Sequence, residues 1–191
     1  MSMWNLPTSL QVGGVGYFIR TDFRVILDIL QAYNDPDNDP EDRNLICLWT
    51  LYRDIESMPP ELYREALDKA VEFIDAGFAP EKNASSKPTL MDWEQDAALI
   101  IPAVNRVAGK EIRSLDYLHW WTFLGYYMEI GESLFTHVIH IRDKRSRGKK
   151  LEKYEQEFFK DNKHLIQLQK KESKREKEEK DAVRELLGYK R

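Results

Sequence analysis

The chain has 191 residues, of which 42% are hydrophobic and 32% are charged, which is enough for one hydrophobic core and too little for two. Its single cysteine, Cys47, excludes an intrachain disulfide and therefore the class of small secreted proteins that disulfides hold together. No stretch approaches the roughly 20 apolar residues of a membrane-spanning helix, and no secretory signal is visible at the start. We therefore expect a soluble protein of a reducing, intracellular compartment.

The net charge of −4 conceals an asymmetry along the chain. Residues 1–141 carry 11 Lys and Arg against 22 Asp and Glu, whereas residues 142–191 carry 18 against 11. We expect a helical globular domain over residues 1–148 and a basic, charged helical arm over residues 149–191. Because opposite charges attract, the arm could dock on its own body, on another copy of the chain or on an acidic partner.

The spacing of apolar residues predicts a mainly α fold, with a short N-terminal β-hairpin followed by a bundle of about six helices and a long charged C-terminal helix. Residues 9–20 alternate between apolar and polar types on either side of Gly13 and Gly14. Glycine adopts the positive φ angles of a two-residue hairpin turn without strain, so the turn is expected there. Thr21 is then expected to cap a helix that ends before Asn34.

The next two helices are predicted from residues typical of helix starts and helix ends. Asp39 followed by Pro40 is typical of a helix start, and a third helix is expected between Pro60 and Gly77. Residues 78–90 contain turn-forming residues and almost nothing to bury, so we expect a connector there. The residues expected to form the buried side of the second helix are Leu45, Leu48, Trp49 and Tyr52, with Cys47 as a small core residue among them.

Three further helices and a long arm helix are expected in the second half of the chain. The predicted bounds of the three are Thr89 or Asp92 to Gly109, 115–128 with Ser114 as the cap, and 132–142. Because residues 115–128 are apolar on nearly every side of the predicted helix, we expect this helix at the centre of the core. Residues 151–187 contain neither proline nor glycine and predict a single helix of 37 residues.

Two histidines are the best candidates for a metal site. His137 and His140 lie three residues apart on a predicted helix, where they could share a metal with Glu129 or Glu132. Their spacing matches none of the strong zinc signatures, and no second cluster of ligands accompanies them. We therefore expect neither a metal nor another cofactor.

No group of residues has the pattern of a catalytic site. His119 has no Ser, Cys or paired acid placed around it by the sequence, which favours a core histidine over a general base. Asp92, Glu94 and Asp96 are explained by the preference of acidic residues for the positive end of a helix dipole. The chain is therefore not expected to be an enzyme.

A basic segment, residues 142–150, has six cations against one acid and would neutralise phosphates. No aromatic residue stands among these cations to stack on bases, and the preceding body is acidic, which disfavours nucleic acid. Nucleic-acid binding is therefore the alternative hypothesis, behind binding to a protein. The cations expected to contact a partner are Arg142, Arg145, Arg147, Lys149 and Lys150.

Several motifs are similar to those of one known family. They are Thr21-Asp22-Phe23-Arg24, Asp92-Trp93-Glu94-Gln95-Asp96, Leu118-His119-Trp120-Trp121-Thr122-Phe123-Leu124, Glu129-Ile130-Gly131-Glu132 and Ile139-His140-Ile141-Arg142. Over about residues 9–168, the chain resembles the gene product 15 family of phages and prophages of Gram-positive bacteria, and the His-Trp-Trp segment is the most specific motif. The signature residues expected in the core are Asp92, Trp93, His119, Trp120, Trp121 and Phe123.

The resemblance implies a tail assembly chaperone of long-tailed phages, with no catalytic residues. Many copies of such a protein would bind the tape measure protein, keep it soluble and recruit tail tube subunits before they leave the finished particle. The implied location is the cytoplasm of the bacterial host, with absence from the mature virion. No membrane partner is expected.

Apolar residues at heptad spacing on the arm are the predicted contact with that partner. They are Leu151, Tyr154, Phe158, Leu165 and Leu168. The same residues could instead dock on the protein's own body, and the C-terminal helix could mediate self-association. The sequence does not decide between these possibilities.

Overall fold

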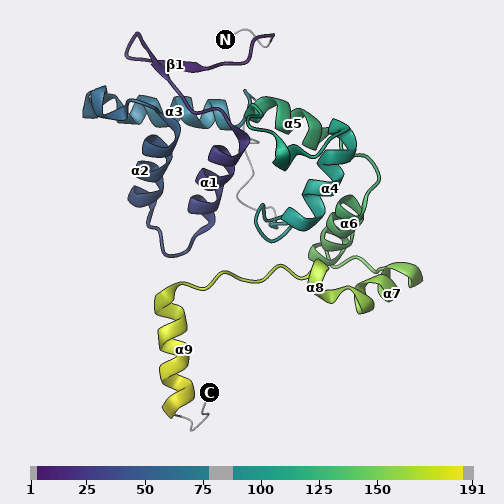
Figure 1. Ribbon diagram of the computed structural model, residues 1–191. Coiled ribbons are helices and arrows are strands. Elements are labelled where there is room, and N and C mark those ends of the chain that lie inside the picture. Colours follow the sequence, from purple (N-terminus) through teal and green to yellow (C-terminus); the bar gives the residue numbers. More distant parts are fainter. Residues whose placement is uncertain (1–3, 78–87, 187–191) are drawn as a thin grey trace.

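The computed structural model describes residues 4–77 and 88–186. Within them a short hairpin is followed by helices, which confirms the predicted mainly α fold with an N-terminal hairpin (Figure 1). The strands are β1 (Ser9–Val12) and β2 (Val15–Phe18), and the α-helices are α1 (Phe23–Asn34), α2 (Pro40–Leu51), α3 (Tyr63–Ile74), α4 (Ala97–Ala108), α5 (Trp120–Met128), α6 (Leu134–Ser146), α7 (Lys153–Asp161), α8 (Lys163–Ile166) and α9 (Lys174–Leu186).

The hairpin turns at the two glycines, as predicted. β1 and β2 are antiparallel with Val12 opposite Val15, and Gly13 and Gly14 between them have φ angles of 56° and 79°. Leu10 and Val12 are buried against α3, whereas β2 contributes no buried residue. The alternation of the strand therefore turns one face of β1 to the core and leaves β2 at the surface.

The cap of the first helix lies one residue later than predicted. Asp22, not Thr21, caps α1, because an Asp22 carboxylate oxygen accepts the backbone N–H of Arg24 at 3.0 Å. The Thr21 hydroxyl lies 2.7 Å from the Tyr117 hydroxyl instead. In α2 the prediction of the cap is confirmed, because Asp39 accepts two backbone N–H groups of the first turn and Pro40 is the first helical residue.

The buried side of α2 differs from the predicted one. Cys47, Leu48 and Leu51 are buried between α1 and α3, and Tyr52 follows them into the core. Leu45 and Trp49, predicted to be buried, are 47% and 50% exposed. Both faces of this helix carry apolar residues, so periodicity alone could not decide which face the neighbouring helices cover.

The helices in the middle of the chain begin at later residues than the sequence predicts. A 3-10 turn over Pro60–Leu62 precedes α3, and Gly77 follows α3 with a φ of 77°. Most of the predicted connector, residues 78–87, lies outside the described residues. α4 begins at Ala97 and not at Thr89 or Asp92, because the Asp92 carboxylate closes a separate turn by accepting the N–H groups of Glu94 and Gln95.

α5 is shorter and more exposed than predicted. Ser114 ends a 3-10 turn over Ile112–Ser114 instead of capping a helix, and α5 begins only at Trp120. Within α5 just Trp120 and Phe123 are buried, and Met128 is exposed. The helix therefore covers one side of the core and does not stand at its centre.

The single 37-residue arm helix is corrected to α7, α8, an extended segment over residues 167–173 and α9. The first break is at Asn162, whose side-chain amide donates to the Phe158 carbonyl at the end of α7. Ile166 at the end of α8 is buried in the core. α9 is the charged C-terminal helix, and it projects away from the other helices (Figure 1).

Candidate partner-binding surface

Arg142, predicted to contact a partner, is instead buried at the junction of α4, α6 and α8. It is 8% exposed, and its guanidinium lies 2.7 and 2.8 Å from the two carboxylate oxygens of Asp96. Its remaining N–H groups donate to the backbone carbonyls of Leu90, Leu165 and Ile166. All five N–H donors of the guanidinium are thus satisfied, so Arg142 has a structural role. Its prediction as a surface residue that contacts a partner is therefore wrong.

The rest of the basic segment is partly neutralised by its own neighbours. Arg147 Nε donates to Asp143 at 2.8 Å, and the Arg145 guanidinium lies 4.0 Å from the ring centroid of Phe159 on α7. Lys149 and Lys150 are exposed and form no ion pair with any described residue. The cationic surface that remains is therefore smaller than the sequence predicts.

Most of the predicted apolar stripe packs on the body of the protein. Leu151, Phe158 and Leu165 are partly buried against the hydrophobic core, and Leu168 is half-buried. Tyr154 is 61% exposed, and its ring lies 6.4 Å from that of His137. Of the two possibilities that the sequence left open, the structure shows docking on the chain's own body for the first three residues.

The two neighbouring histidines have different surroundings. His137 lies edge-on to Phe158, with the ring centroids 4.6 Å apart, whereas His140 Nε2 is 3.5 Å from a carboxylate oxygen of Glu155. Glu155 also accepts from Lys144 Nζ at 2.7 Å, and this hydrogen bond, aided by the Glu152 N–H, holds the pKa of Glu155 below its usual value. Among residues 4–77 and 88–186, no three His, Cys, Asp or Glu side chains are grouped to hold a metal.

The family signature forms an aromatic cluster around α5. Trp93 packs against Trp120 and Phe123, with ring centroids 6.2 and 6.1 Å apart. The indole N–H groups of Trp120 and Trp121 donate to the carbonyls of Ile74 and Phe73 at the end of α3, each at 2.8 Å. Both bonds satisfy a polar atom that burial would otherwise leave without a partner. The cluster therefore joins α3 to α5 and has a structural role.

His119 acts as the cap of α5. Its Nδ1 accepts the backbone N–H of Trp121 at 3.0 Å, so Nε2 carries the proton and donates to the Pro7 carbonyl at 3.0 Å. Burial lowers the pKa of His119, which favours the neutral ring that both bonds require. The interpretation as a satisfied core histidine agrees with this geometry.

α2 carries an exposed apolar face whose residues the apolar spacing of the sequence assigns to the core. Leu45 and Trp49 are one helical turn apart and both half exposed, and Phe18 at the end of β2 is 61% exposed. The Phe18 carbonyl accepts the backbone N–H of Arg53, and Trp49 and Arg53 line one cavity of about 520 Å³ together with Arg20. We call Leu45, Trp49 and Arg53 the Trp49 face.

The charges beside the Trp49 face are mixed, because Asp54 and Glu56 line the same cavity as Arg20 and Arg53. Arg20 donates three hydrogen bonds to the backbone carbonyls of Trp49, Thr50 and Tyr52. These bonds stabilise the C-terminal end of α2. The exposed Arg53 side chain makes no hydrogen bond or ion pair with a described residue. Exposed apolar side chains and an exposed cation thus lie close together at the end of α2.

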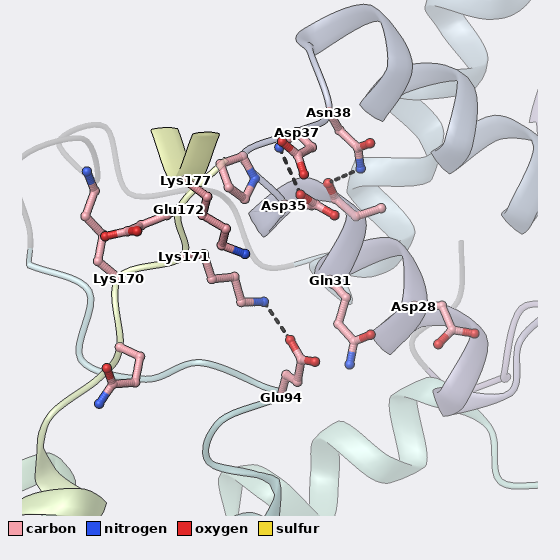
Figure 2. A pocket seen from close by; sticks show the side chains of 13 residues that line it. Asp28, Gln31, Asp35, Asp37, Asn38, Glu94, Lys170, Lys171, Glu172 and Lys177 are labelled. Atoms are coloured by element: carbon pink, nitrogen blue, oxygen red, sulfur yellow. Dashed lines mark hydrogen bonds and ion pairs between the residues drawn. The ribbon is translucent and has the colours of Figure 1, made fainter. Parts of the chain in front are cut away.

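A second surface is an acidic groove between the end of α1 and the chain after α8. Its walls include Asp28, Asp35, Asp37 and Glu94, and it has a volume of about 750 Å³. Figure 2 shows Lys171 reaching across it to Glu94, where Nζ lies 2.7 Å from a carboxylate oxygen. This hydrogen bond raises the pKa of Lys171.

In the described part of the chain, the fold is that of a small helical protein with an N-terminal hairpin, an exposed apolar face on α2 and a groove lined by carboxylates. No described helix is both long and apolar enough to span a membrane. The family model of the Bacteriophage Gp15 protein matches residues 3–171, so the chain belongs to this family of phage structural or assembly-related proteins. Neither a curated protein nor a solved structure shows significant similarity to it.

Proposed function

We propose that the chain is a non-enzymatic tail assembly chaperone of a long-tailed phage of Gram-positive bacteria. It binds the tape measure protein, keeps it soluble and recruits tail tube subunits in the host cytoplasm, and it is absent from the mature virion. Membership of the Gp15 family supports the assembly role in general. The Trp49 face is the observation that carries the specific proposal.

The Trp49 face supports this function because of its chemistry. Large apolar side chains one turn apart are the kind of surface on which the apolar stripe of a client helix packs. The neighbouring Arg53 can pair with an acidic residue at the edge of that stripe. Leu151, Phe158 and Leu165 pack on the body, which supports a client contact on α2 over one on the arm.

The test is co-expression with the tape measure protein of the same phage. The chain is expected to increase the soluble fraction of the client, and the double variant Leu45→Ser, Trp49→Ser to lose most of this increase. Val71→Ser changes an equally exposed apolar residue on α3 and serves as the matched control. An insoluble client in the presence of the wild-type chain would contradict the proposal, as would full activity of the double variant.

Nucleic-acid binding remains the alternative function, supported by the unpaired Lys149 and Lys150. Because Arg142 is buried and Arg147 is paired, few cations are free to replace counterions on a phosphate backbone. A gel shift at low salt that disappears in the charge reversals of Arg145, Arg147, Lys149 and Lys150 would favour this alternative. No shift at low salt would reject it.

A further inference from the structure

Residues 169–174 lead from α8 to the start of α9 and are bound to the body by polar contacts. The backbone N–H of Gln169 donates to the Gln95 side chain at 2.7 Å, and the Gln169 carbonyl accepts from the same side chain at 3.1 Å. Lys171 Nζ lies 2.7 Å from a carboxylate oxygen of Glu94. We call residues 169–174 the strap.

The far end of the strap is bound to the body at the first residue of α9. An Asp37 carboxylate oxygen accepts the backbone N–H of Lys174 at 2.7 Å. Asp37 belongs to the loop between α1 and α2, and it places a negative charge at the positive end of the α9 dipole (Figure 1). The Ser173 hydroxyl accepts the backbone N–H of Glu176 at 3.1 Å and completes the cap. The direction of α9 therefore depends on a loop of the body.

The partners of the strap on the body are fixed by contacts of their own. The Asp92 carboxylate accepts the backbone N–H groups of Glu94 and Gln95 and so holds the turn before α4. Arg142 binds Asp96 at the end of this turn, and it also binds two backbone carbonyls at the end of α8. The turn and the point from which the strap departs are therefore held together without any contact of the strap.

The strap itself has no apolar side chain to bury. Ile166 is buried in the core and Leu168 is half-buried, and the sequence has no further apolar residue before Ala182. A rotation of the backbone at residues 167–168 would therefore break the polar contacts of the strap and leave the core intact. Polar contacts of this kind at the surface contribute little to stability, and salt weakens their ionic part.

We propose that the strap is an electrostatic latch, which opens and closes as one unit and so decides whether α9 is held or free. Figure 2 shows Lys171 between Glu94 and the loop that carries Asp35 and Asp37. Without this cation, carboxylates from two separate segments would face one another across the groove, and like charges repel. Because the contacts follow one another along one short extended chain, the loss of one removes the restraint that keeps the others in place.

Amide hydrogen exchange, measured by NMR on the full chain, tests the latch. The N–H groups of Gln169 and Lys174 donate to the body at the two ends of the strap, so their exchange rates report its closure. Both are expected to exchange at least about threefold faster at 0.5 M than at 0.05 M NaCl, concentrations between which the Debye length falls from roughly 14 to 4 Å. The N–H of Ile166, which donates to the Asn162 carbonyl, should keep its rate because it precedes the hinge.

Two substitutions distinguish a single unit from independent contacts. Lys171→Gln removes the central cation, and Asp37→Ala removes the acceptor of the Lys174 N–H. At low salt, each is expected to accelerate exchange of the Gln169 N–H at least about threefold, although Gln169 is bound to neither side chain. Lys171→Arg keeps the charge and should keep most of the protection.

Two further variants are matched controls. Asp28→Ala removes a carboxylate of the same groove that binds no described residue, and Lys163→Gln removes an exposed cation of α8. Both should leave the exchange of Gln169 and Lys174 nearly unchanged. Acceleration of Lys174 alone in Asp37→Ala overturns the inference, as do rates that are independent of salt, wild-type protection in Lys171→Gln, equal acceleration in the controls or equal acceleration of the Ile166 N–H.

Discussion

Arg142 on α6 and Asp96 beside the start of α4 form a bidentate ion pair, with nitrogen–oxygen distances of 2.7 and 2.8 Å. Both side chains are buried, and the same guanidinium also binds carbonyls before α4 and at the end of α8. One residue therefore holds together three segments that lie far apart in the sequence. This arrangement gives the first prediction.

Arg142→Met is expected to lower the free energy of unfolding by about 3–5 kcal/mol, because Asp96 is left as a buried charge without a partner. Removing both charges, in Asp96→Leu, Arg142→Met, should recover part of this loss. Arg147→Ala is the control, since its pair with Asp143 is largely exposed, and it should cost less than about 1 kcal/mol. Urea unfolding measures all three, and similar losses for Arg142→Met and Arg147→Ala would contradict the structural role of Arg142.

The position of Phe123 in the aromatic cluster gives the second prediction. Its ring stacks between Phe23 and Trp120, at centroid distances of 4.8 and 5.6 Å, and is 2% exposed. Phe123→Ala is expected to cost about 3–5 kcal/mol through the cavity that it leaves. Met128→Ala, on the exposed side of the same helix, should change stability by about 0.5 kcal/mol or less. Thermal or urea unfolding of the two variants distinguishes a stacked core position from a general intolerance of α5 to substitution.

Local signals in the sequence predicted the elements near which they lie. The Gly13-Gly14 turn and the Asp39-Pro40 helix start depend on the conformational preferences of adjacent residues, and the structure has both where they were expected. The aromatic motif around Trp120 likewise marked the part of the core that α5 covers.

Features that depend on distant residues could not be predicted. The run of cations around Arg142 predicts a surface residue, because its partner Asp96 lies 46 positions earlier and nothing local connects the two. The exposure of Trp49 follows from which face of α2 the helices α1 and α3 cover, and the interruption of the arm follows from the docking of Ile166. The candidate site on α2 was missed for this reason.

The hairpin turn gives the third prediction. Gly13 and Gly14 both have positive φ angles, so an alanine at either position is strained by about 1–2 kcal/mol. A β-carbon at Gly13 would also lie 2.8 Å from Leu62 Cδ1, whereas one at Gly14 would meet no atom within 4 Å. Urea unfolding should therefore show a larger loss for Gly13→Ala than for Gly14→Ala, and the reverse order would contradict the register of the hairpin.

The buried thiol of Cys47 gives the fourth prediction, on the dependence of stability on pH. Burial raises the pKa of Cys47 to about 11, and burial together with Cys47 raises that of the Tyr33 hydroxyl to about 12. The folded state therefore favours the neutral thiol, which stabilises the fold. This contribution to the free energy of unfolding is fully present below the unfolded-state pKa of Cys, about 8.5. It is lost as the pH rises from there toward 11. The free energy of unfolding should be steady from about pH 7 to 8 and fall above about pH 9.

Comparison with Cys47→Ala isolates the thiol from every other group that titrates at high pH. The fall in unfolding free energy between about pH 9 and 10 should be shallower in this variant, because one group with a raised pKa has been removed. In the wild-type chain, a thiol reagent at about pH 8 should react far more slowly with the folded protein than with the protein unfolded in urea, since the thiolate is the reacting species. Equal labelling rates in the two states, or identical pH profiles for the two chains, would show that Cys47 is accessible to solvent and does not titrate as a buried group.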